Sequence, residues 1–396
     1  MNIPKLRFKD NNGNDYPQWE KKKLGDIVQF LDNKRKPLEQ SERIHGKYPY
    51  YGASGIIDYI NNYIFDEELV LLSEDGANII DRNYPICYIA TGKYWVNNHA
   101  HVLKTKSQYL NKFLCEALER LNYNKYNTGT AQPKLNQDIC KNILLNIPIL
   151  HEQEKIANFF STIDKKIKNL ANTITSLENQ KKGLLQQIFS QKLRFKDKNG
   201  NNYPNWKKKK LGKLLSITSS KRVHEADWTT SGIPFYRARD IVSIFNNKPI
   251  SKIYISEKLY EECSSSCGKI SENDLLVTGV GTIGIPYLVK KSDKFYFKDG
   301  NIIWLKNSPA IYGKYLFYIF ISSYVQKQIN MMTGKGTVGT YTIKNAKDTN
   351  ILLPCLEEQT KIADFLSEFD RKLDNQKAQL EHWQQIKKGL LQQMFV

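Results

Sequence analysis

The sequence predicts an α+β protein with a pseudo-twofold internal repeat. Two similar globular domains alternate with two long α-helices, and the helices pair as an antiparallel coiled coil. Three observations lead to this fold class. The chain of 396 residues repeats its own opening halfway along. Each copy ends in a long run of heptad-spaced apolar residues. The segments between mix short strand-like runs, turn signals and one helix.

The repeat has two conserved frames. "KLRFKDNNGNDYPQW" begins at Lys5, and "KLRFKDKNGNNYPNW" begins at Lys192. "IPILHEQEKIANFFSTIDKKI" begins at Ile147, and "LPCLEEQTKIADFLSEFDRKL" begins at Leu353. Because the period is very long, this is a duplicated domain with its helix rather than a solenoid of small units.

The middle segments of the two copies, roughly 28–146 and 215–352, resemble each other only faintly. Near-identical frames around divergent middles indicate one architecture with different targets, and neutral drift of the middles is the alternative. The expected domains are 1–150 and 193–355, and the expected helices are 151–192 and 356–396.

Each long helix is predicted from apolar residues whose spacing alternates between four and three, which is typical of a coiled coil. A helix of about 35 residues is about 50 Å long. An apolar seam of that length needs a partner, and the other copy is the simplest one. The alternative is two amphipathic helices, each packed on its own domain. The seam residues are Ile156, Phe160, Ile163, Ile167, Leu170, Ile174, Leu177, Ile362, Leu366, Phe369, Leu373, Leu380 and Trp383.

The middle segments predict compact α+β domains. The runs Glu68–Gly76 ("ELVLLSEDG") and Asn273–Gly281 ("NDLLVTGVG") each predict a buried strand that enters a glycine turn. Apolar residues between Leu110 and Leu121 have helical spacing, and Tyr315–Tyr324 is their counterpart in the second copy.

The charge balance points to a polyanionic partner. The chain has 59 Lys+Arg against 40 Asp+Glu, a formal net charge of +19, which favours nucleic acid over a merely solvated surface. Six scattered cysteines form no paired CxxC framework, so a reducing compartment is expected. With no secretory signal and no long apolar run, we expect a soluble, cytoplasmic protein without a membrane partner.

Aromatic and basic residues alternate at matched places in the two middles. "YPYYGAS" (Tyr48–Ser54) aligns with "IPFYRAR" (Ile233–Arg239). If the second segment is a strand, Arg237 and Arg239 share one face, and such arginines can read guanine edges. Lysines and arginines elsewhere would contact phosphate. Solvated surface charge and tight turns are the alternatives. The candidate DNA contacts are Lys34, Arg35, Lys36, Tyr50, Tyr51, Ser54, Lys93, Thr130, Gln132, Lys134, Lys221, Arg222, Tyr236, Arg237, Arg239, Lys335 and Thr337.

Motifs for catalysis and metal binding are weak. Gly279, Gly281 and Gly284 form GxGxxG, but a strand-like run follows where a dinucleotide site needs a helix, which favours a turn. His99 and His101 would share a strand face, but no third metal ligand accompanies them. The chain contains no Walker A sequence and no Asn-Pro-Pro-Tyr methyltransferase signature, so we expect no catalytic residues, metal or cofactor in it.

The segments "YPQWEKKKLG" and "YPNWKKKKLG" precede the two middles. A proline followed by a Glu-Gln-x-Lys-Ile-Ala helix comes after each middle. In these flanking segments, the chain resembles the specificity subunit of type I restriction–modification systems. The resemblance covers essentially the whole chain. "YYGASGIIDYI" from Tyr50 and "GKYWVNNHAHVL" from Gly92 also resemble segments of that family's target-recognition domains.

The resemblance implies that each domain reads one half of a bipartite double-stranded DNA target and that the coiled coil sets the gap. It implies two methyltransferase (modification) subunits that bind S-adenosylmethionine, and restriction subunits that use ATP and Mg. Two other interpretations stay open from the residues alone. One is a self-contained methyltransferase or nuclease, and the other is a coiled-coil interaction protein without a DNA function.

Overall fold

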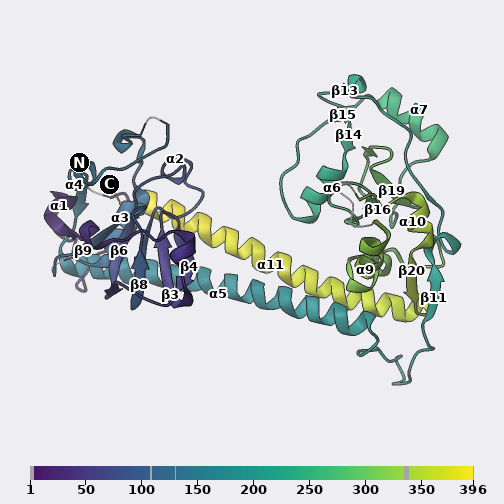
Figure 1. Cartoon of the computed structure of the whole chain (residues 1–396), viewed down its shortest axis with the longest axis horizontal. Coiled ribbons are helices and arrows are strands. Elements are labelled where there is room, and N and C mark those ends of the chain that lie inside the picture. The colour runs from purple at the N-terminus through teal and green to yellow at the C-terminus, as the bar shows by residue number, and fades with distance from the viewer. Residues whose placement is uncertain (1–3, 108, 130, 334–338, 396) are drawn as a thin grey trace. The chain divides into compact units, whose positions relative to one another are not determined.

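The computed structural model describes residues 4–107, 109–129, 131–333 and 339–395. The chain forms two compact units, one made of residues 1–172 with 377–396 and the other of residues 173–376. The long helices α5 (Leu150–Phe189) and α11 (Leu356–Met394) each contribute part of their length to both units (Figure 1). Each unit is therefore one globular domain with a stretch of each long helix.

The described residues of the first domain form one two-stranded and two four-stranded sheets. β1 (Glu20–Lys23) pairs antiparallel with β10 (Leu144–Ile147). The first large sheet has the order β2-β9-β6-β7, comprising Val28–Phe30, Ala100–Thr105, Leu69–Ser73 and Cys87–Ala90. The second has the order β4-β3-β8-β5, comprising Gly55–Ile60, His45–Gly52, Lys93–Val96 and Phe65–Asp66, and its β3 and β8 run parallel.

The second domain repeats this plan. β11 (Lys207–Lys210) pairs antiparallel with β20 (Asn350–Leu353). One large sheet has the order β12-β19-β16-β17, comprising Ile217–Thr218, Ile302–Leu305, Leu275–Thr278 and Pro286–Leu288. The other has the order β13-β15-β14-β18, comprising Trp228–Thr229, Tyr254–Ile255, Ile233–Tyr236 and Tyr296–Phe297, and its β14 and β18 run parallel. The faintly similar middles therefore share the strand order of the first large sheet and three strands of the second, in which β5 and β13 lie at opposite edges.

Short helices complete each domain. The two predicted apolar helices are confirmed as α3 (Asn111–Arg120) and α8 (Gly313–Ile321). The strands predicted before the glycine turns are confirmed as β6 and β16. The remaining helices are α1 (Leu24–Ile27), α2 (Asn78–Asp81), α4 (Gln137–Lys141), α6 (Ala238–Phe245), α7 (Glu257–Cys267), α9 (Ser323–Thr333) and α10 (Ile343–Asp348).

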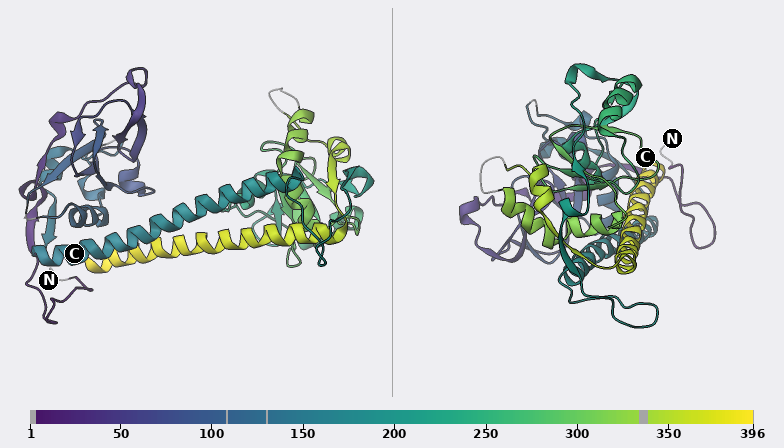
Figure 2. Two further views of the ribbon diagram at one scale, coloured as in Figure 1. Left: turned by 90° about the horizontal axis from the view of Figure 1, so that it is seen from below. Right: turned by 90° about the vertical axis from the view of Figure 1, so that its right-hand side faces the viewer.

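Within each unit, α5 and α11 lie side by side and run in opposite directions (Figures 1 and 2). In the first unit, Ile156 and Phe160 near the start of α5 share a core with Leu391 and Met394 near the end of α11. In the second unit, Ile188 at the end of α5 shares a core with residues near the start of α11. The coiled coil is therefore antiparallel. Each of the predicted seam residues is buried or half-buried.

A buried carboxylate explains the conserved frame of the repeat. In the first unit, Glu152 accepts hydrogen bonds from Arg7 at 2.7 and 2.8 Å and from the Trp19 indole at 3.1 Å. In the second unit, Glu358 accepts the same bonds from Arg194 and Trp206 at 2.8 to 3.0 Å. Because a buried charge must be paired, the "KLRF…W" segment and the "EEQ/HEQ" helix start have to be retained together.

Each seam also contains a lysine that is paired with acidic side chains. The Nζ atom of Lys387 lies 2.8 Å from Asp164 and 3.0 Å from Glu116 in the first unit. In the second unit, Lys181 pairs with Asp370, which also accepts a hydrogen bond of 2.6 Å from Tyr318. Burial lowers the pKa of Lys387, but the charges of Glu116 and Asp164 outweigh it, so the pKa is raised and the ammonium stays charged.

All six cysteines of the chain are free thiols. Among the helices of the described ranges, none combines the length and the apolar character that a membrane span requires.

Candidate DNA interface

The two domains present corresponding faces, built by the turn that follows β6 or β16 and the turn that precedes β9 or β19. In the first domain, the Glu74 amide donates to the His99 carbonyl at 2.9 Å. In the second, the Gly279 amide donates to the Asn301 carbonyl at 2.8 Å. A third segment closes each face, because Leu135 donates to the Glu74 carbonyl and Tyr341 donates to the Gly279 carbonyl. The backbones therefore match at both of these hydrogen bonds.

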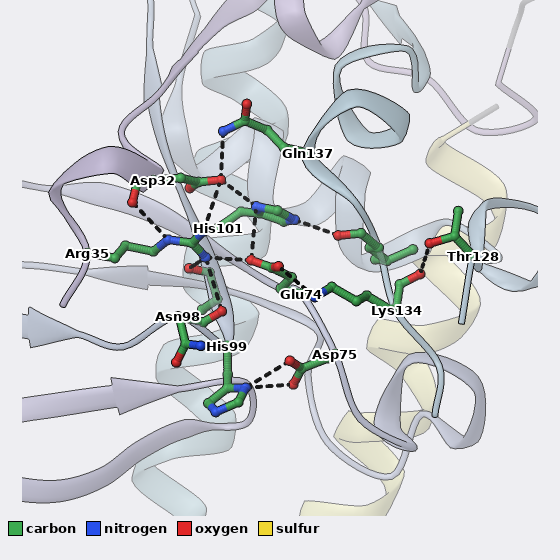
Figure 3. A network of polar contacts seen from close by, with 12 residues as sticks. Asp32, Arg35, Glu74, Asp75, Asn98, His99, His101, Thr128, Lys134 and Gln137 are labelled. Carbon is green, nitrogen blue, oxygen red and sulfur yellow. Dashed lines mark hydrogen bonds and ion pairs between the residues drawn. The ribbon is translucent and has the colours of Figure 1, made fainter. Parts of the chain in front are cut away.

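A buried ionic network fills the first face (Figure 3). Arg35 donates to Glu74 at 2.6 Å and to the Ala100 carbonyl at 2.8 Å. Asp32 accepts from His101 at 2.6 Å and from Gln137 at 2.9 Å, and its other oxygen accepts from the Val102 amide at 2.9 Å. These bonds tie the loop after β2 to β9, to the turn after β6 and to α4.

The imidazole of His101 is doubly protonated in this network. Its Nδ1 faces the Asp32 carboxylate and its Nε2 faces the Leu135 carbonyl at 2.7 Å, so both ring nitrogens meet acceptors. Burial lowers the pKa of His101, but the hydrogen bond that it donates to Asp32, with smaller contributions from Cys140, outweighs burial and raises the pKa to about 10. Burial raises the pKa of Asp32, but the bond and charge of His101 outweigh it, so that pKa is lowered.

Asp32, Glu74 and His101 place their donor atoms within 4.8 Å of one another, which is a donor set that suits a divalent cation. The guanidinium of Arg35 already lies 2.6 Å from Glu74 and 3.5 Å from Asp32. It neutralises both carboxylates from within the protein.

His99 differs from His101, although the two are separated by a single residue. His99 precedes β9, is exposed and meets both oxygens of Asp75 at 2.8 and 3.0 Å. His101 lies within β9 and is buried. The prediction that the two rings share a strand face is wrong, because the strand begins only at Ala100. Their side chains reach different carboxylates (Figure 3).

The second face is hollowed instead of filled. A cavity of about 700 Å³ lies among α6, the turn after β16 and the segment before β19. Its lining residues are Glu225, Trp228, Arg237, Ala238, Arg239, Val242, Ser243, Val280, Gly281, Thr282, Lys298 and Asn301. The glycine motif at its edge is confirmed as a turn, because Gly281 and Gly284 have φ of 69° and 78° and strand β17 follows.

The predicted arginine strand needs a correction. β14 ends at Tyr236, Arg237 precedes α6, and Arg239 lies on that helix. Arg237 is 8% exposed and donates to both oxygens of Asp240 at 2.7 and 3.0 Å, whereas Arg239 is exposed. The two side chains do not share a strand face, because the side chain of Asp240 caps the helix and accepts the Arg237 guanidinium.

Several other candidate DNA contacts are buried or half-buried within the two domains. Tyr50 is 1% exposed and its hydroxyl accepts a hydrogen bond from the Leu38 amide at 2.9 Å. Arg35 is held in the ionic network. Tyr51 is half-buried against Tyr88, and Tyr236 is half-buried against Phe295. Contact between these residues and DNA stays a prediction. Their burial makes direct contact with DNA unfavourable.

The exposed candidates are Lys34, Lys36, Ser54, Lys93, Gln132, Lys134, Lys221, Arg222 and Arg239. Thr130, Lys335 and Thr337 lie outside the described residues.

Sequence reasoning missed the acidic half of the first face and most of the second cavity. Asp32 and Glu74 carried a weak signal, since each follows closely on a run of strand residues. Trp228 and Lys298 carried none, because their neighbours in the cavity are distant in the chain.

Comparison with known proteins divides the chain into the same two copies as the internal repeat. The family model described as "Type I restriction modification DNA specificity domain" matches residues 16–179 and again residues 203–382. A putative type I restriction enzyme specificity subunit of Haemophilus influenzae is 31% identical over 353 residues, covering 89% of this chain and 87% of that protein. A type I restriction enzyme specificity subunit of Methanocaldococcus jannaschii is 24% identical, covering 97% of this chain and 94% of that protein.

Among solved structures, the S subunit of a type I restriction–modification system from M. genitalium aligns with a TM-score of 0.62 at 18% identity. The alignment covers 100% of this chain and 99% of that one, and it shows the same fold.

Proposed function

The chain belongs to the type I restriction–modification DNA specificity family, and from this premise we propose that each domain reads one half of a split DNA target. The observation that carries the proposal is the pair of faces, which keep one backbone and hold different side chains. Direct readout requires particular donors and acceptors at base edges. Two faces with different chemistry would therefore read two different half-sites.

The coiled coil sets the gap between the half-sites in this proposal. Its two helices are antiparallel, so an insertion in one helix must be matched in the other to keep the seam paired. One added heptad in each lengthens the helices by about 10 Å. With a rise of about 3.4 Å per base pair, the gap grows by about three base pairs.

The methyltransferase subunits dock on the frames, one on each unit. The frames are near-identical in sequence and in their buried contacts, as Glu152 and Glu358 show. Two equal surfaces suit two copies of one partner. S-adenosylmethionine would be bound by those partners, and ATP and Mg by restriction subunits. The target base would be turned out into a partner's pocket, since chemistry on a stacked base requires extrusion. We place the assembly in the cytoplasm, where it meets DNA.

The experiment is a duplication of one reader within the chain. Replacing residues 28–146 by residues 215–352 gives both units the second face. The methylated target, mapped by sequencing modified adenines in a host that also expresses the partner subunits, is expected to become an inverted repeat of one half-site. An unchanged asymmetric target would contradict the proposal. Binding of S-adenosylmethionine by the isolated chain would favour a self-contained methyltransferase instead.

A further inference from the structure

The cavity in the second domain has the donors of a base-reading site. Trp228 lines the cavity, while its indole Nε1 is buried from solvent and has no hydrogen-bond partner among the described residues. Arg239 and Lys298 line the same cavity, and Arg239 is exposed. Indole, guanidinium and ammonium are donors only.

Hydrogen bonds position two of the residues that line the cavity, Arg237 and Lys298. Arg237 is clamped by Asp240 and also donates to the Ser251 carbonyl at 3.3 Å, with its guanidinium 5.8 Å from the centre of the Trp228 ring. The Lys298 amide donates to the Tyr236 carbonyl at 2.9 Å, which fixes the backbone from which the Lys298 side chain extends. Arg237 is therefore a wall of the cavity, and Arg239 is the arginine that is placed to meet a ligand.

The corresponding place in the first domain lacks these donors. Asn97 makes the hydrogen bond that matches that of Lys298, donating to the Tyr51 carbonyl at 3.0 Å. Asn97 is 4% exposed and its side chain accepts from the His99 amide, so it is used internally. The turn there carries Asp75, an acceptor, where the second domain has Val280. The shared turns therefore carry different side chains, and helix α6, which carries Arg239, follows β14 where the β3–β4 hairpin follows in the first domain.

We infer that the cavity of the second domain receives the acceptor edge of a guanine in its half-site, with Arg239 as a specificity-determining residue. This inference rests on the proposed function. Guanine offers two adjacent acceptors, O6 and N7, in the major groove, and an arginine can donate to both. A cavity of about 700 Å³ has room for a base edge and its bridging waters. The cavity is open to solvent, so a base edge in a groove can approach Arg239 without leaving its stack.

The test compares methylated targets in a host that expresses the full chain with its partner subunits. Arg239→Ala is expected to relax the target at one G·C pair of one half-site, by about 5- to 150-fold in relative modification rate, and to leave the other half-site unchanged. Arg239→Lys retains the charge and loses the paired geometry, so it is expected to relax the same position with less loss of total modification.

Arg222→Ala is the matched control, since Arg222 is an exposed arginine of the same domain that does not line the cavity. It is expected to leave the target sequence unchanged. Thermal unfolding of each variant would show whether the fold is retained, and Arg239→Lys keeps the test valid if Arg239→Ala does not fold.

The outcomes separate this inference from the proposed function. If the unaltered chain directs methylation at no split target, the proposed function itself fails. If it does so and Arg239→Ala leaves every position equally specific, the inference about the cavity is wrong. A uniform loss on all sequences with an unchanged target would mean that Arg239 contacts phosphate, and this also overturns base reading.

Discussion

In the first domain, the turn after β6 carries Glu74 and Asp75, whereas the same turn in the second domain carries Gly279 and Val280. The loop after β2 places Arg35 inside, 13% exposed by its side chain and paired with two acids. Arg222 follows β12 in the same way but is 71% exposed, with one pair to Asp299 at 3.2 Å. One scaffold thus has an ionic interior at its first face and an open cavity at its second.

The difference teaches where divergence is tolerated. Backbone hydrogen bonds and the frame ion pairs are the same in both units, because a buried polar group without a partner is penalised wherever it lies. The side chains at the two faces differ as groups of interacting residues rather than singly. The first face holds several acids together with the cations that neutralise them, whereas the second face has the single buried pair of Arg237 and Asp240 at the wall of its cavity.

The largest expected effect comes from breaking the first network. Asp32→Asn removes the partner of His101 and one partner of Arg35, leaving buried positive charge. We expect a loss of about 3–5 kcal/mol of local stability in the first domain. Ser219, which follows β12, donates to the Ile302 carbonyl at 2.9 Å. Ser219→Ala is expected to cost about 1 kcal/mol in the second domain.

Hydrogen exchange resolved by peptide would measure both variants, because a two-domain chain has no single unfolding free energy. Equal losses of exchange protection in the two variants would contradict the view that the ionic network of the first face stabilises its domain more than the Ser219 hydrogen bond stabilises the second.

The next effect is a pH dependence confined to the first domain. The pKa of His101 is raised to about 10 in the folded state from an ordinary value near 6.5, so its stabilisation is full below pH 6.5 and is lost as the pH rises toward 10. The slope for one proton is at most about 1.4 kcal/mol per pH unit. Because the Asp32 pKa is lowered, its own contribution is lost only on acidification below about pH 4.

The measurement is exchange protection of β9 and β19 at pH 7 and pH 9, corrected for the intrinsic exchange rate. Protection of β9 is expected to fall more than that of β19, where Ile303 pairs with Val277 in the ladder and no histidine is present. A parallel fall in both strands would show that His101 is not the cause.

The sequence alone was enough to predict the fold, because a duplicated frame and a heptad seam are local and periodic signals. Strand β6 and helix α3 followed from runs of apolar residues in the same way. The two faces could not be predicted at the same level. Arg237 sits beside Arg239 in the sequence, yet its guanidinium is taken by Asp240 and helix α6 begins between them. Whether a charge is buried or exposed depends on partners that only the tertiary fold brings together.

The seam lysines give an intermediate effect that differs between the units. Lys387→Met is expected to cost about 2 kcal/mol, because Glu116 is 2% exposed, has one carboxylate oxygen without a partner and would share its remaining cation, Lys112, with Asp164. Lys181→Met is expected to cost about 1 kcal/mol, since Asp370 is a third exposed and keeps its hydrogen bond from Tyr318. Exchange protection of α5 on either side of its middle would measure the two losses, and the reverse order would refute the argument.

The smallest effect on stability, and the one that separates surface charge from interior charge, is that of Arg222→Ala. The ion pair of Arg222 is exposed, so its loss is expected to cost less than about 0.5 kcal/mol. If Arg222 contacts a phosphate, the variant binds all DNA sequences more weakly, and the slope of log K against log salt falls by about 0.9.

Arg35→Ala is the counterpart of Arg222→Ala in the first domain. It is expected to destabilise that domain while leaving the salt slope unchanged, because its guanidinium is spent on Glu74 and the Ala100 carbonyl. Gel-shift titrations of the assembled complex at several salt concentrations would test both, and an equal change of slope in the two variants would show that burial does not decide which arginine meets DNA.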